Sequence, residues 1–375
     1  MSTIEQILEK FKDVAVRVPS IYSLSPSWHP RVVPDLNGKV EEGVELWRQR
    51  WLLEPTVYKQ IRAADCGYFT RATSPDANVA NLQIGAKFSS WLFAWDDALD
   101  LGSLKDGARQ RELIRIEMLR TIQKGLLGET VIEQPPDWRD APPTLAESFY
   151  DIGFSLQEGT ELEPLQHFLC DQLCRYVAGA FRLEDAFQDG IIMDLDVYLE
   201  NRMENSGVYH MIGQSLILQD ITLPAWFINH PIQREMMRHI NIMVSMLNDI
   251  VSARNELRYK HVDNIVPLLV YHRGLEPQEA VYQSCQIIND SYATFESLVP
   301  EVLDLASKNG LAEGPAFVTC CKDFYIGAVN WLYEFFPSDQ TVSSLNLTNY
   351  GRYNSKRYHD FRPEDGETEA LIPMW

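Results

Sequence analysis

Long amphipathic stretches separated by prolines limit the fold of this chain more than any other feature. From Val40 onward, apolar residues recur at intervals of three and four, as at Val44, Trp47 and Trp51, which is the spacing of one face of an α-helix. This periodicity predicts helices at Thr144–Leu156, Pro164–Gln188, Asp194–Ile217, Pro231–Glu256, Pro277–Leu298, Glu301–Asn309 and Gly314–Phe335. The sequence contains no alternation typical of strands, no glycine-rich phosphate loop and no internal repeat. We therefore expect one all-α domain of about ten helices.

The two ends of the chain differ in composition from this helical region. Prolines are dense near the start, at positions 19, 26, 30 and 34, so residues 1–39 are expected to form an irregular N-terminal arm. Residues 40–361 are expected to form the helical domain. Residues 362–375 carry several charges together with Pro363 and Gly366, and we expect them to form a charged, solvated C-terminal tail.

Net charge excludes several classes of partner. Acidic residues outnumber basic ones by 53 to 33, which gives a net charge of −20. Such a chain is repelled by nucleic acid and by an anionic membrane surface. No apolar run reaches the roughly 18 residues that a membrane span needs, and the first residues lack the order of a signal peptide. The six cysteines form no CxxC pair, which favours reduced thiols in the cytoplasm.

Three aspartates follow an apolar run at one helix end. Asp96 and Asp100 lie one helical turn apart and share a face, and Asp97 lies within three residues of Asp100. Carboxylates this close repel one another, and a hard divalent cation such as Mg²⁺ offsets that repulsion. The alternative is a solvated helix end that binds nothing.

A second polar pattern lies about 150 residues later. Asn248, Ser252 and Glu256 recur every fourth residue, so their side chains project from one stripe of a helix. An amide oxygen, a hydroxyl and a carboxylate at this spacing form a three-point oxygen site for one hard cation. The alternative is that Asn248 and Ser252 bond to the backbone while Glu256 is exposed.

The two patterns in this order, in an all-α chain, resemble the aspartate-rich and Asn-Ser-Glu motifs of the class I terpene synthases. The resemblance spans about Trp47 to Phe361 and implies an α-helical bundle around a central active-site cavity. The family also has a diphosphate-sensing arginine about 46 residues before the Asn, which is Arg202 here. Its C-terminal Arg-Tyr pair corresponds to Arg357-Tyr358, with Arg352-Tyr353 as a rival pair.

Two departures from the family pattern affect these assignments. The lysine that often precedes the motif glutamate is replaced by Asn255, with Arg254 one position earlier. A shift of one residue turns a helical side chain by about 100°, so contact between Arg254 and the diphosphate stays an open alternative. No DxDD motif and no second DDxxD motif is present, which argues against protonation-initiated cyclisation and against chain-elongating prenyl transfer.

The resemblance implies a carbon–oxygen lyase of isoprenoid biosynthesis, similar to microbial and fungal sesquiterpene synthases. It would ionise and cyclise a linear prenyl diphosphate, with C15 farnesyl diphosphate favoured and C10 and C20 substrates open, and release diphosphate with a cyclic hydrocarbon or alcohol. Three Mg²⁺ ions are expected, with Mn²⁺ as a substitute. Asp96 and Asp100 would hold two of them, and Asn248, Ser252 and Glu256 the third. Asp97 would orient a basic residue.

The same resemblance assigns the remaining site residues. Diphosphate would be bound by Arg202, Asn248, Arg254, Arg357 and Tyr358. The apolar wall of the substrate pocket should come from residues one and two turns before each metal motif, from the helix break at Gly207 and from the last helix. These are Phe88, Ser89, Leu92, Phe93, Ser206, Gly207, Val244, Ser245, Phe324 and Trp331. We expect His210 to be a packed core residue.

Two rival functions remain for the structure and comparisons to test. One is a prenyltransferase that joins two isoprenoid diphosphates, and the other is a non-catalytic all-α binding protein. No sequence feature marks a subunit interface, so a monomer and a homodimer are both open.

Overall fold

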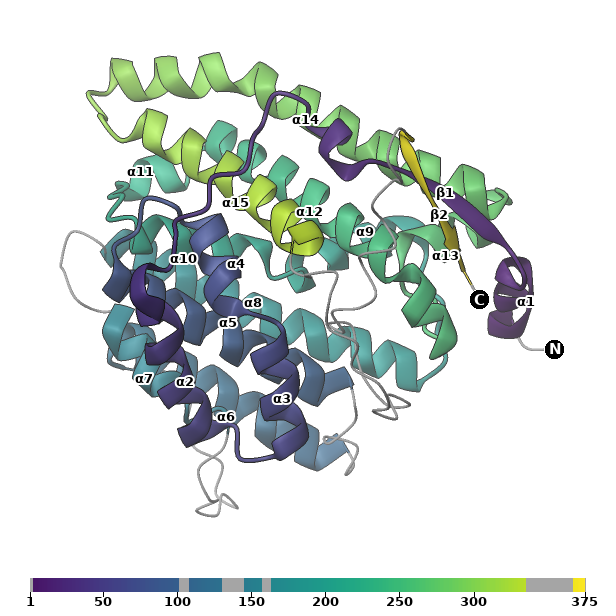
Figure 1. Cartoon of the computed structure of the whole chain (residues 1–375), viewed down its shortest axis with the longest axis horizontal. Helices are drawn as coiled ribbons and strands as arrows, with labels where there is room; N and C mark the ends of the chain where they lie inside the picture. The colour runs from purple at the N-terminus through teal and green to yellow at the C-terminus, as the bar shows by residue number, and fades with distance from the viewer. Residues whose placement is uncertain (1–2, 101–107, 130–144, 157–162, 335–366, 375) are drawn as a thin grey trace.

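The computed structural model describes residues 3–100, 108–129, 145–156, 163–334 and 367–374. Within these residues the chain is built almost entirely of helices, which confirms the all-α expectation (Figure 1). The α-helices are α1 (Thr3–Phe11), α2 (Lys39–Trp51), α3 (Pro55–Ala63), α4 (Cys66–Thr73), α5 (Val79–Asp100), α6 (Ala108–Leu127), α7 (Phe149–Gly153), α8 (Glu163–Gln188), α9 (Leu195–Asn205), α10 (Val208–Leu218), α11 (Ala225–Ile228), α12 (Pro231–Arg258), α13 (Ile265–Arg273), α14 (Pro277–Lys308) and α15 (Gly314–Glu334). The 3-10 helices are η1 (Ile21–Leu24), η2 (Leu36–Gly38) and η3 (Phe154–Leu156), and the strands are β1 (Ala15–Pro19) and β2 (Glu369–Pro373).

Helix α10 lies at the centre of the bundle. Every residue from Val208 to Leu218 except Tyr209 is buried, and a helix that is hydrophobic on all sides is a core helix. It packs against α5, α8, α12 and α15, while α14 runs along one edge of the molecule over α12 and α15 (Figure 1). The space between these helices holds the site described below.

The helix expected at Asp194–Ile217 is interrupted, and it forms α9 and α10 instead. Gly207 has a left-handed φ of +78°, which glycine adopts without the steric cost that a Cβ brings. The break thus falls at the glycine that the sequence marks as permitting it. It turns the end of α9 toward α12, where Ser206 contacts Asn241.

Two helix boundaries differ from the expectation. The segments Pro277–Leu298 and Glu301–Asn309 form the single helix α14, which continues through Pro300. Proline removes one backbone hydrogen bond and destabilises a helix interior, but buried Phe295, Val302 and Ala306 on both sides hold α14 against the core. In the described part of Thr144–Leu156, only the short α7 and η3 form.

The expectations for the two ends of the chain were wrong in part. The N-terminal arm contains α1 and β1, and the C-terminal tail contains β2, which pairs antiparallel with β1 in the register Val16↔Ile372. Ala370, Ile372 and Met374 are buried and Leu371 is exposed. Residues 370–374 are all apolar in the sequence, so the alternation appears only in the burial of the folded strand and could not be read from the residue types. Gln278 of α14 donates to the carbonyl oxygen of Arg17 and accepts from its amide nitrogen.

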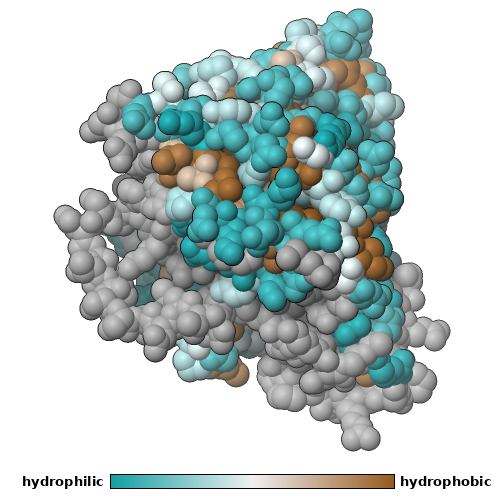
Figure 2. Space-filling view, turned by 90° about the vertical axis from the view of Figure 1, so that its right-hand side faces the viewer, coloured by the Kyte–Doolittle hydropathy of each residue, from teal (hydrophilic) through white to brown (hydrophobic). Residues whose placement is uncertain are grey.

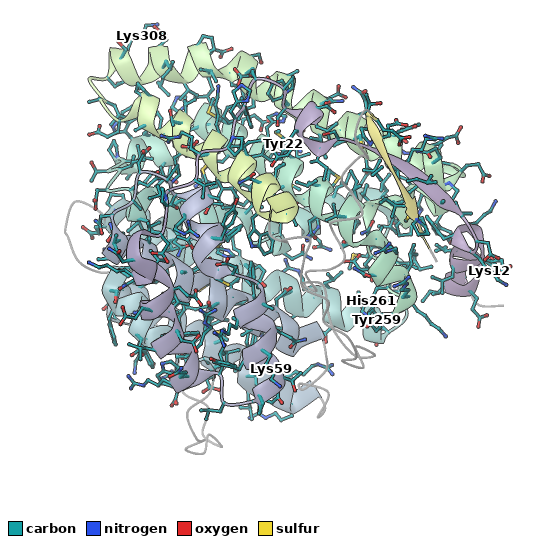
Figure 3. The ribbon with its side chains drawn as sticks, viewed as in Figure 1. Lys12, Tyr22, Lys59, Tyr259, His261 and Lys308 are labelled. Atoms are coloured by element: carbon teal, nitrogen blue, oxygen red, sulfur yellow. The ribbon has the colours of Figure 1, made fainter. Side chains whose placement is uncertain are left out.

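The arm is also bonded to the helices that carry the site. The Tyr22 hydroxyl, labelled in Figure 3, donates to Asn330 Oδ1 of α15 at 2.7 Å. Asn330 Nδ2 in turn donates to the Tyr68 hydroxyl of α4 at 2.7 Å. This chain of bonds holds α4 and α15 together next to Trp331, whose indole nitrogen donates to the Ala64 carbonyl oxygen at 2.8 Å.

On the coloured part of the face shown in Figure 2, hydrophilic residues predominate, with smaller hydrophobic patches between them. Among the helices in the described ranges, none combines the length and hydrophobicity that crossing a bilayer requires.

Close backbone contact between α4 and α15 makes a testable prediction. A Cβ at Gly327 would lie 2.2 Å from the carbonyl oxygen and 2.5 Å from the carbonyl carbon of Ala72. Backbone atoms cannot rotate away, so Gly327→Ala should lower the free energy of unfolding by about 2 kcal/mol, as overpacking does. Urea unfolding measures this change.

Gly43→Ala in α2 is the matched control. The added Cβ would meet only side-chain atoms of Gln83, from Cγ outward, and this flexible side chain can move aside. Replacing an interior helical glycine with alanine then stabilises by up to about 1 kcal/mol. Equal effects of the two variants would contradict the tight contact between α4 and α15.

Candidate active site

A cavity opens between α4, α5, α8, α12, α15 and the break between α9 and α10. Its polar lining includes Asp96, Tyr176, Arg202, Asn205 and Asn248. On both α5 and α12, an apolar lining residue lies one turn before a polar one, as Phe93 does before Asp96 and Val244 before Asn248. Such a cavity suits a molecule with a polar or charged head and a hydrocarbon chain.

Most of the expected pocket residues line this cavity. They are Leu92, Phe93, Ser206, Gly207, Val244, Ser245, Phe324 and Trp331. The sequence did not indicate Phe69 of α4, Tyr176 of α8 or Met211 of α10, which also line it. Those three come from helices without a metal motif, so only the tertiary packing brings them to the site.

Phe88 and Ser89 are not among the lining residues, and their assignment to the pocket was wrong. The Phe88 ring is fully buried and packs against Trp91, Phe149 and His210. The Ser89 hydroxyl donates to the Gly85 carbonyl oxygen at 3.0 Å. Two turns before Asp96, α5 is covered by neighbouring helices, so a residue on the same face there lies in the core.

The aspartate-rich segment reaches the cavity at Asp96. The Tyr176 hydroxyl donates to Asp96 Oδ1 at 3.0 Å, so α8 fixes the position of this carboxylate. Asp97 and Asp100 belong to α5, but their side chains lie outside the described residues. Arg357-Tyr358 and the rival pair Arg352-Tyr353 also lie outside them.

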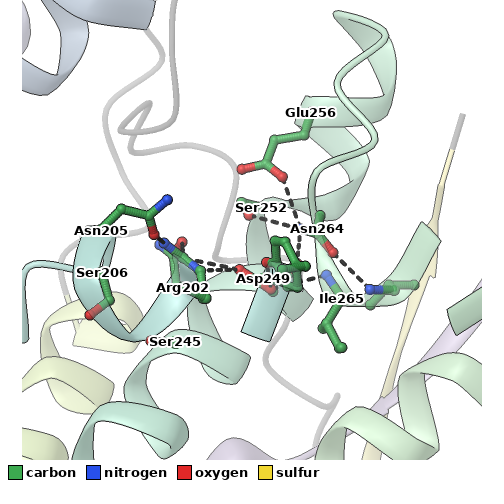
Figure 4. Close-up of polar contacts among 12 residues, drawn as sticks. Arg202, Asn205, Ser206, Ser245, Asp249, Ser252, Glu256, Asn264 and Ile265 are labelled. Carbon is green, nitrogen blue, oxygen red and sulfur yellow. Dashed lines mark hydrogen bonds and ion pairs between the residues drawn. The ribbon is translucent and has the colours of Figure 1, made fainter. Parts of the chain in front are cut away.

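Arg202 contacts three side chains at the polar side of the cavity (Figure 4). Its Nη2 donates to Asn248 Oδ1 at 2.6 Å, its Nε donates to Asp249 Oδ1 at 3.0 Å, and its Nη1 lies 3.4 Å from Asn205 Oδ1. The side chain is almost fully buried. The arginine expected to sense diphosphate thus lies directly beside the Asn-Ser-Glu stripe.

Asp249 is buried and holds Arg202 from behind. Its carboxylate accepts from the Tyr198 hydroxyl and from the backbone nitrogen of Ile265 at 3.0 Å, in addition to Arg202. Burial raises the pKa of the Asp249 carboxyl, and the Arg202 cation acts in the opposite direction. The sequence placed Asp249 inside the second motif without indicating this role.

Asn264 contacts the other end of the stripe. Its Nδ2 lies 2.9 Å from Glu256 Oε2, 3.4 Å from Ser252 Oγ and 2.8 Å from the Asp249 carbonyl oxygen (Figure 4). Its Oδ1 accepts from the Val266 amide and caps α13. An asparagine before an apolar run is an N-cap signal, but only the fold brings it onto the stripe.

The residues of the stripe suit a hard cation. Asn248, Ser252 and Glu256 offer an amide oxygen, a hydroxyl and a carboxylate from one face of α12, and all three donors are oxygens. Within the described ranges, no cluster of three or more His, Cys, Asp or Glu side chains is placed to hold a metal. Any ion here therefore depends on the amide and the hydroxyl. Arg254 is buried on α12 and is not among the residues that line the cavity.

His210 lies behind the cavity wall, in the core as expected. Its ring packs against Phe88 and Tyr176, and its Nε2 has no hydrogen-bond partner. Burial lowers the pKa of His210 from 6.5 to about 3. The ring is therefore neutral near pH 7 and is not present there as the imidazolium acid.

This burial makes stability depend on pH. The unfolded chain protonates His210 near pH 6.5, whereas the folded chain does so only near pH 3. The free energy of unfolding is therefore unaffected by His210 above pH 6.5 and decreases as pH falls toward 3, because the unfolded chain binds the proton more strongly. The decrease is about 2 kcal/mol between pH 7 and pH 5. His210→Asn removes the titrating group and should flatten the unfolding free energy over this range. Denaturant titrations at pH 7 and pH 5 measure this. If the difference in unfolding free energy between the two pH values is the same in the variant and in the unchanged chain, a buried neutral His210 is contradicted.

Comparison with known proteins agrees with this geometry. The family model described as terpene synthase family 2, C-terminal metal binding, matches residues 87–294, which is more than half of the chain. A sesquiterpene cyclase of Aspergillus oryzae is 25% identical over 342 residues and aligns with 89% of this chain and 88% of its own length. A germacrene A synthase of Nostoc punctiforme is 22% identical, with 84% of this chain and 96% of its own length aligned.

Solved structures share the fold. A linalool/nerolidol synthase from Streptomyces clavuligerus superimposes with a TM-score of 0.67 at 20% identity, over 81% of this chain and 98% of its own. An a-eudesmol synthase does so with a TM-score of 0.68 at 17% identity, over 81% and 96%. Together with the family match across α5 to α14, these findings show that the chain belongs to the terpene synthase family, whose members are lyases that act on prenyl diphosphates.

Proposed function

We propose that this chain ionises and cyclises C15 farnesyl diphosphate in a Mg²⁺-dependent reaction, and releases diphosphate with a cyclic terpene hydrocarbon or alcohol. One observation carries the proposal. Arg202 and Asn248 are hydrogen-bonded to each other and both line a cavity whose remaining wall is largely apolar and aromatic. A diphosphate head and an isoprenoid chain fit these two parts.

The polar side would bind the diphosphate and its metals. Asp96 and Asp100 would hold two Mg²⁺ ions, and Asn248, Ser252 and Glu256 would hold the third, with Mn²⁺ as a substitute. Bound there, the ions would neutralise the diphosphate and favour its departure from the allylic carbon. The oxygen-only donor set of α12 supports this assignment.

Basic residues of the chain would complete the diphosphate site. Arg202 would exchange its present partners for diphosphate oxygens through charge-assisted hydrogen bonds. Arg254, Arg357 and Tyr358 stay proposed as further donors, and Asp97 as the carboxylate that orients one of the basic side chains. The array would stabilise the leaving anion at the moment the carbon–oxygen bond ionises.

The apolar wall would fold the isoprenoid chain and shield its cation. Phe69, Phe93 and Trp331 contact one another, with ring centroids 5.2 to 5.9 Å apart. All three line the cavity. Aromatic faces attract positive charge without reacting as a nucleophile would, and a closed apolar wall excludes water that would quench the cation.

Relatives and cysteine chemistry support the finer parts of the proposal. The Aspergillus oryzae relative is named a sesquiterpene cyclase, which favours a C15 substrate here. All six cysteines are free, as is usual in the reducing cytoplasm, where we place the reaction.

Incubation of the purified chain with Mg²⁺ and, separately, C10, C15 and C20 prenyl diphosphates tests the proposal. The organic extract and the released diphosphate are both measured. The C15 substrate should give a cyclic product and an equal amount of diphosphate. Asp96→Asn combined with Asp100→Asn should reduce both by at least about 100-fold, because metal-bound charge stabilisation is lost, while the helical circular dichroism is retained.

Other results would contradict the proposal. Product that appears only when a second isoprenoid diphosphate is added would indicate a prenyltransferase. Full activity in the double aspartate variant would remove these residues from the metal site. No diphosphate release from any of the three substrates would favour a non-catalytic binding protein.

Asn264 provides a further prediction about the third metal. Asn264→Ser keeps an N-cap for α13 but is too short to reach Ser252 and Glu256, so the ligands lose an orienting partner. Replacing a residue that orients metal ligands through hydrogen bonds weakens metal affinity by about 10- to 100-fold. The variant should need correspondingly more Mn²⁺ for binding in the presence of inorganic diphosphate, as measured by electron paramagnetic resonance of free Mn²⁺.

Leu268→Ala is the control for stability. Leu268 is fully buried in α13 and contributes no polar atom to the stripe, and its truncation costs about 2 to 5 kcal/mol. It should leave the Mn²⁺ requirement unchanged. A similar shift in both variants would mean that Asn264 acts only through the stability of α13.

A further inference from the structure

Two hydroxyl groups interrupt the mostly apolar wall of the cavity. Ser206 lies at the break between α9 and α10, and Ser245 comes from α12, one turn before Asn248. Both line the cavity together with Val244 and Met211. An isoprenoid chain offers no hydrogen-bonding group to match them. Their role is therefore sought in the protein groups to which they are hydrogen-bonded.

One buried amide accepts both hydroxyls. Ser206 Oγ donates to Asn241 Oδ1 at 2.8 Å, and Ser245 Oγ donates to the same atom at 2.9 Å. Asn241 is fully buried and does not line the cavity. A carbonyl oxygen has two lone pairs, so the two serines use its whole accepting capacity.

The orientation of this amide is fixed from its other end. Asn241 Nδ2 donates to the Met203 carbonyl oxygen at 2.8 Å. Met203 lies in the last turn of α9, where backbone carbonyls lack a partner within the helix. The amide therefore cannot flip without losing three hydrogen bonds.

Because the two hydroxyl protons are fixed, the directions of the oxygen lone pairs are fixed as well. A serine hydroxyl has one proton and two lone pairs. With each proton held on Asn241, lone pairs remain on the other sides of the oxygens, and Ser206 Oγ accepts from the Val208 amide with one of them at 3.3 Å. The C-terminal end of α9 and the N-terminal end of α10 meet at this break, and their opposite partial charges offset each other. The fixed lone pairs of the two hydroxyl oxygens are therefore what favours positive charge at this point of the wall.

We propose that Asn241 is a positioning residue for product specificity, and that it turns the Ser206 and Ser245 oxygens so that they stabilise carbocation charge next to the helix break. The inference rests on the proposed cyclisation and deepens it. Cations whose charge lies near the break are favoured over isomers whose charge lies elsewhere along the chain. Which products form then depends on a residue that never touches the substrate.

The test compares Asn241→Leu with the double variant Ser206→Ala, Ser245→Ala. Both remove the fixed lone pairs, one by releasing the hydroxyl protons and the other by removing the oxygens. Each should change the ratio of the main terpene to its by-products by about tenfold, which corresponds to about 1.4 kcal/mol, and in the same direction. Products from farnesyl diphosphate are separated by gas chromatography and normalised to the diphosphate released.

The control is Ser90→Ala. Ser90 is a buried serine of α5 whose hydroxyl donates to the Ala86 carbonyl oxygen at 2.8 Å, and it does not line the cavity. Its product ratio should equal that of the unchanged chain. A shift as large as those of the other variants would show that the ratio responds to any buried serine, and would overturn the proposal.

Three further results are decisive. An unchanged product ratio in the double serine variant overturns the role of the hydroxyls, even if Asn241→Leu does not fold. An Asn241→Leu variant that loses stability or diphosphate release but keeps the product ratio shows a purely structural asparagine. No diphosphate release by the unchanged chain refutes the proposed function itself, and with it this inference.

Discussion

The buried carboxylate of Asp249 holds together α9, α12 and α13, which position Arg202 and the Asn-Ser-Glu stripe of the candidate site. It accepts from Arg202 and Tyr198 of α9 and from the first amide of α13, while it belongs to α12 itself. A buried charge without such donors is strongly destabilising, whereas one with this many partners fixes the geometry around it. The place of Arg202 beside Asn248, and of Asn264 beside Glu256, depends on this one group.

Neighbouring faces of helix α12 have different roles. Asn248, Ser252 and Glu256 share one stripe, and Asp249, one residue further and about 100° round, faces α9 and α13. One turn before Asn248, Val244 and Ser245 line the cavity, and Asn241 lies behind the wall and receives two hydroxyls. A single helix thus carries the proposed metal ligands, the carboxylate that binds Arg202 and part of the cavity wall. Residues that never touch the substrate fix the orientation of each.

Helical periodicity made the stripe on α12 and the position of Asp96 predictable, because spacing along one helix decides which side chains share a face. Eight of the ten pocket residues that the family resemblance implied line the cavity. The prediction for Phe88 was wrong because, two turns before Asp96, the same face of α5 lies in the core. Phe69, Tyr176 and Asn264 could not be found from sequence, since only packing between distant helices brings them to the site. The β1–β2 pair depends on residues 350 to 358 positions apart.

The most direct measurement is a crystal structure of the whole chain with Mn²⁺ and inorganic diphosphate. The account predicts anomalous density about 2.0–2.3 Å from Asn248 Oδ1, Ser252 Oγ and a Glu256 carboxylate oxygen, with the Arg202 guanidinium on a diphosphate oxygen. Diphosphate bound with Mn²⁺ elsewhere, and no anomalous density at these three side chains, would contradict it.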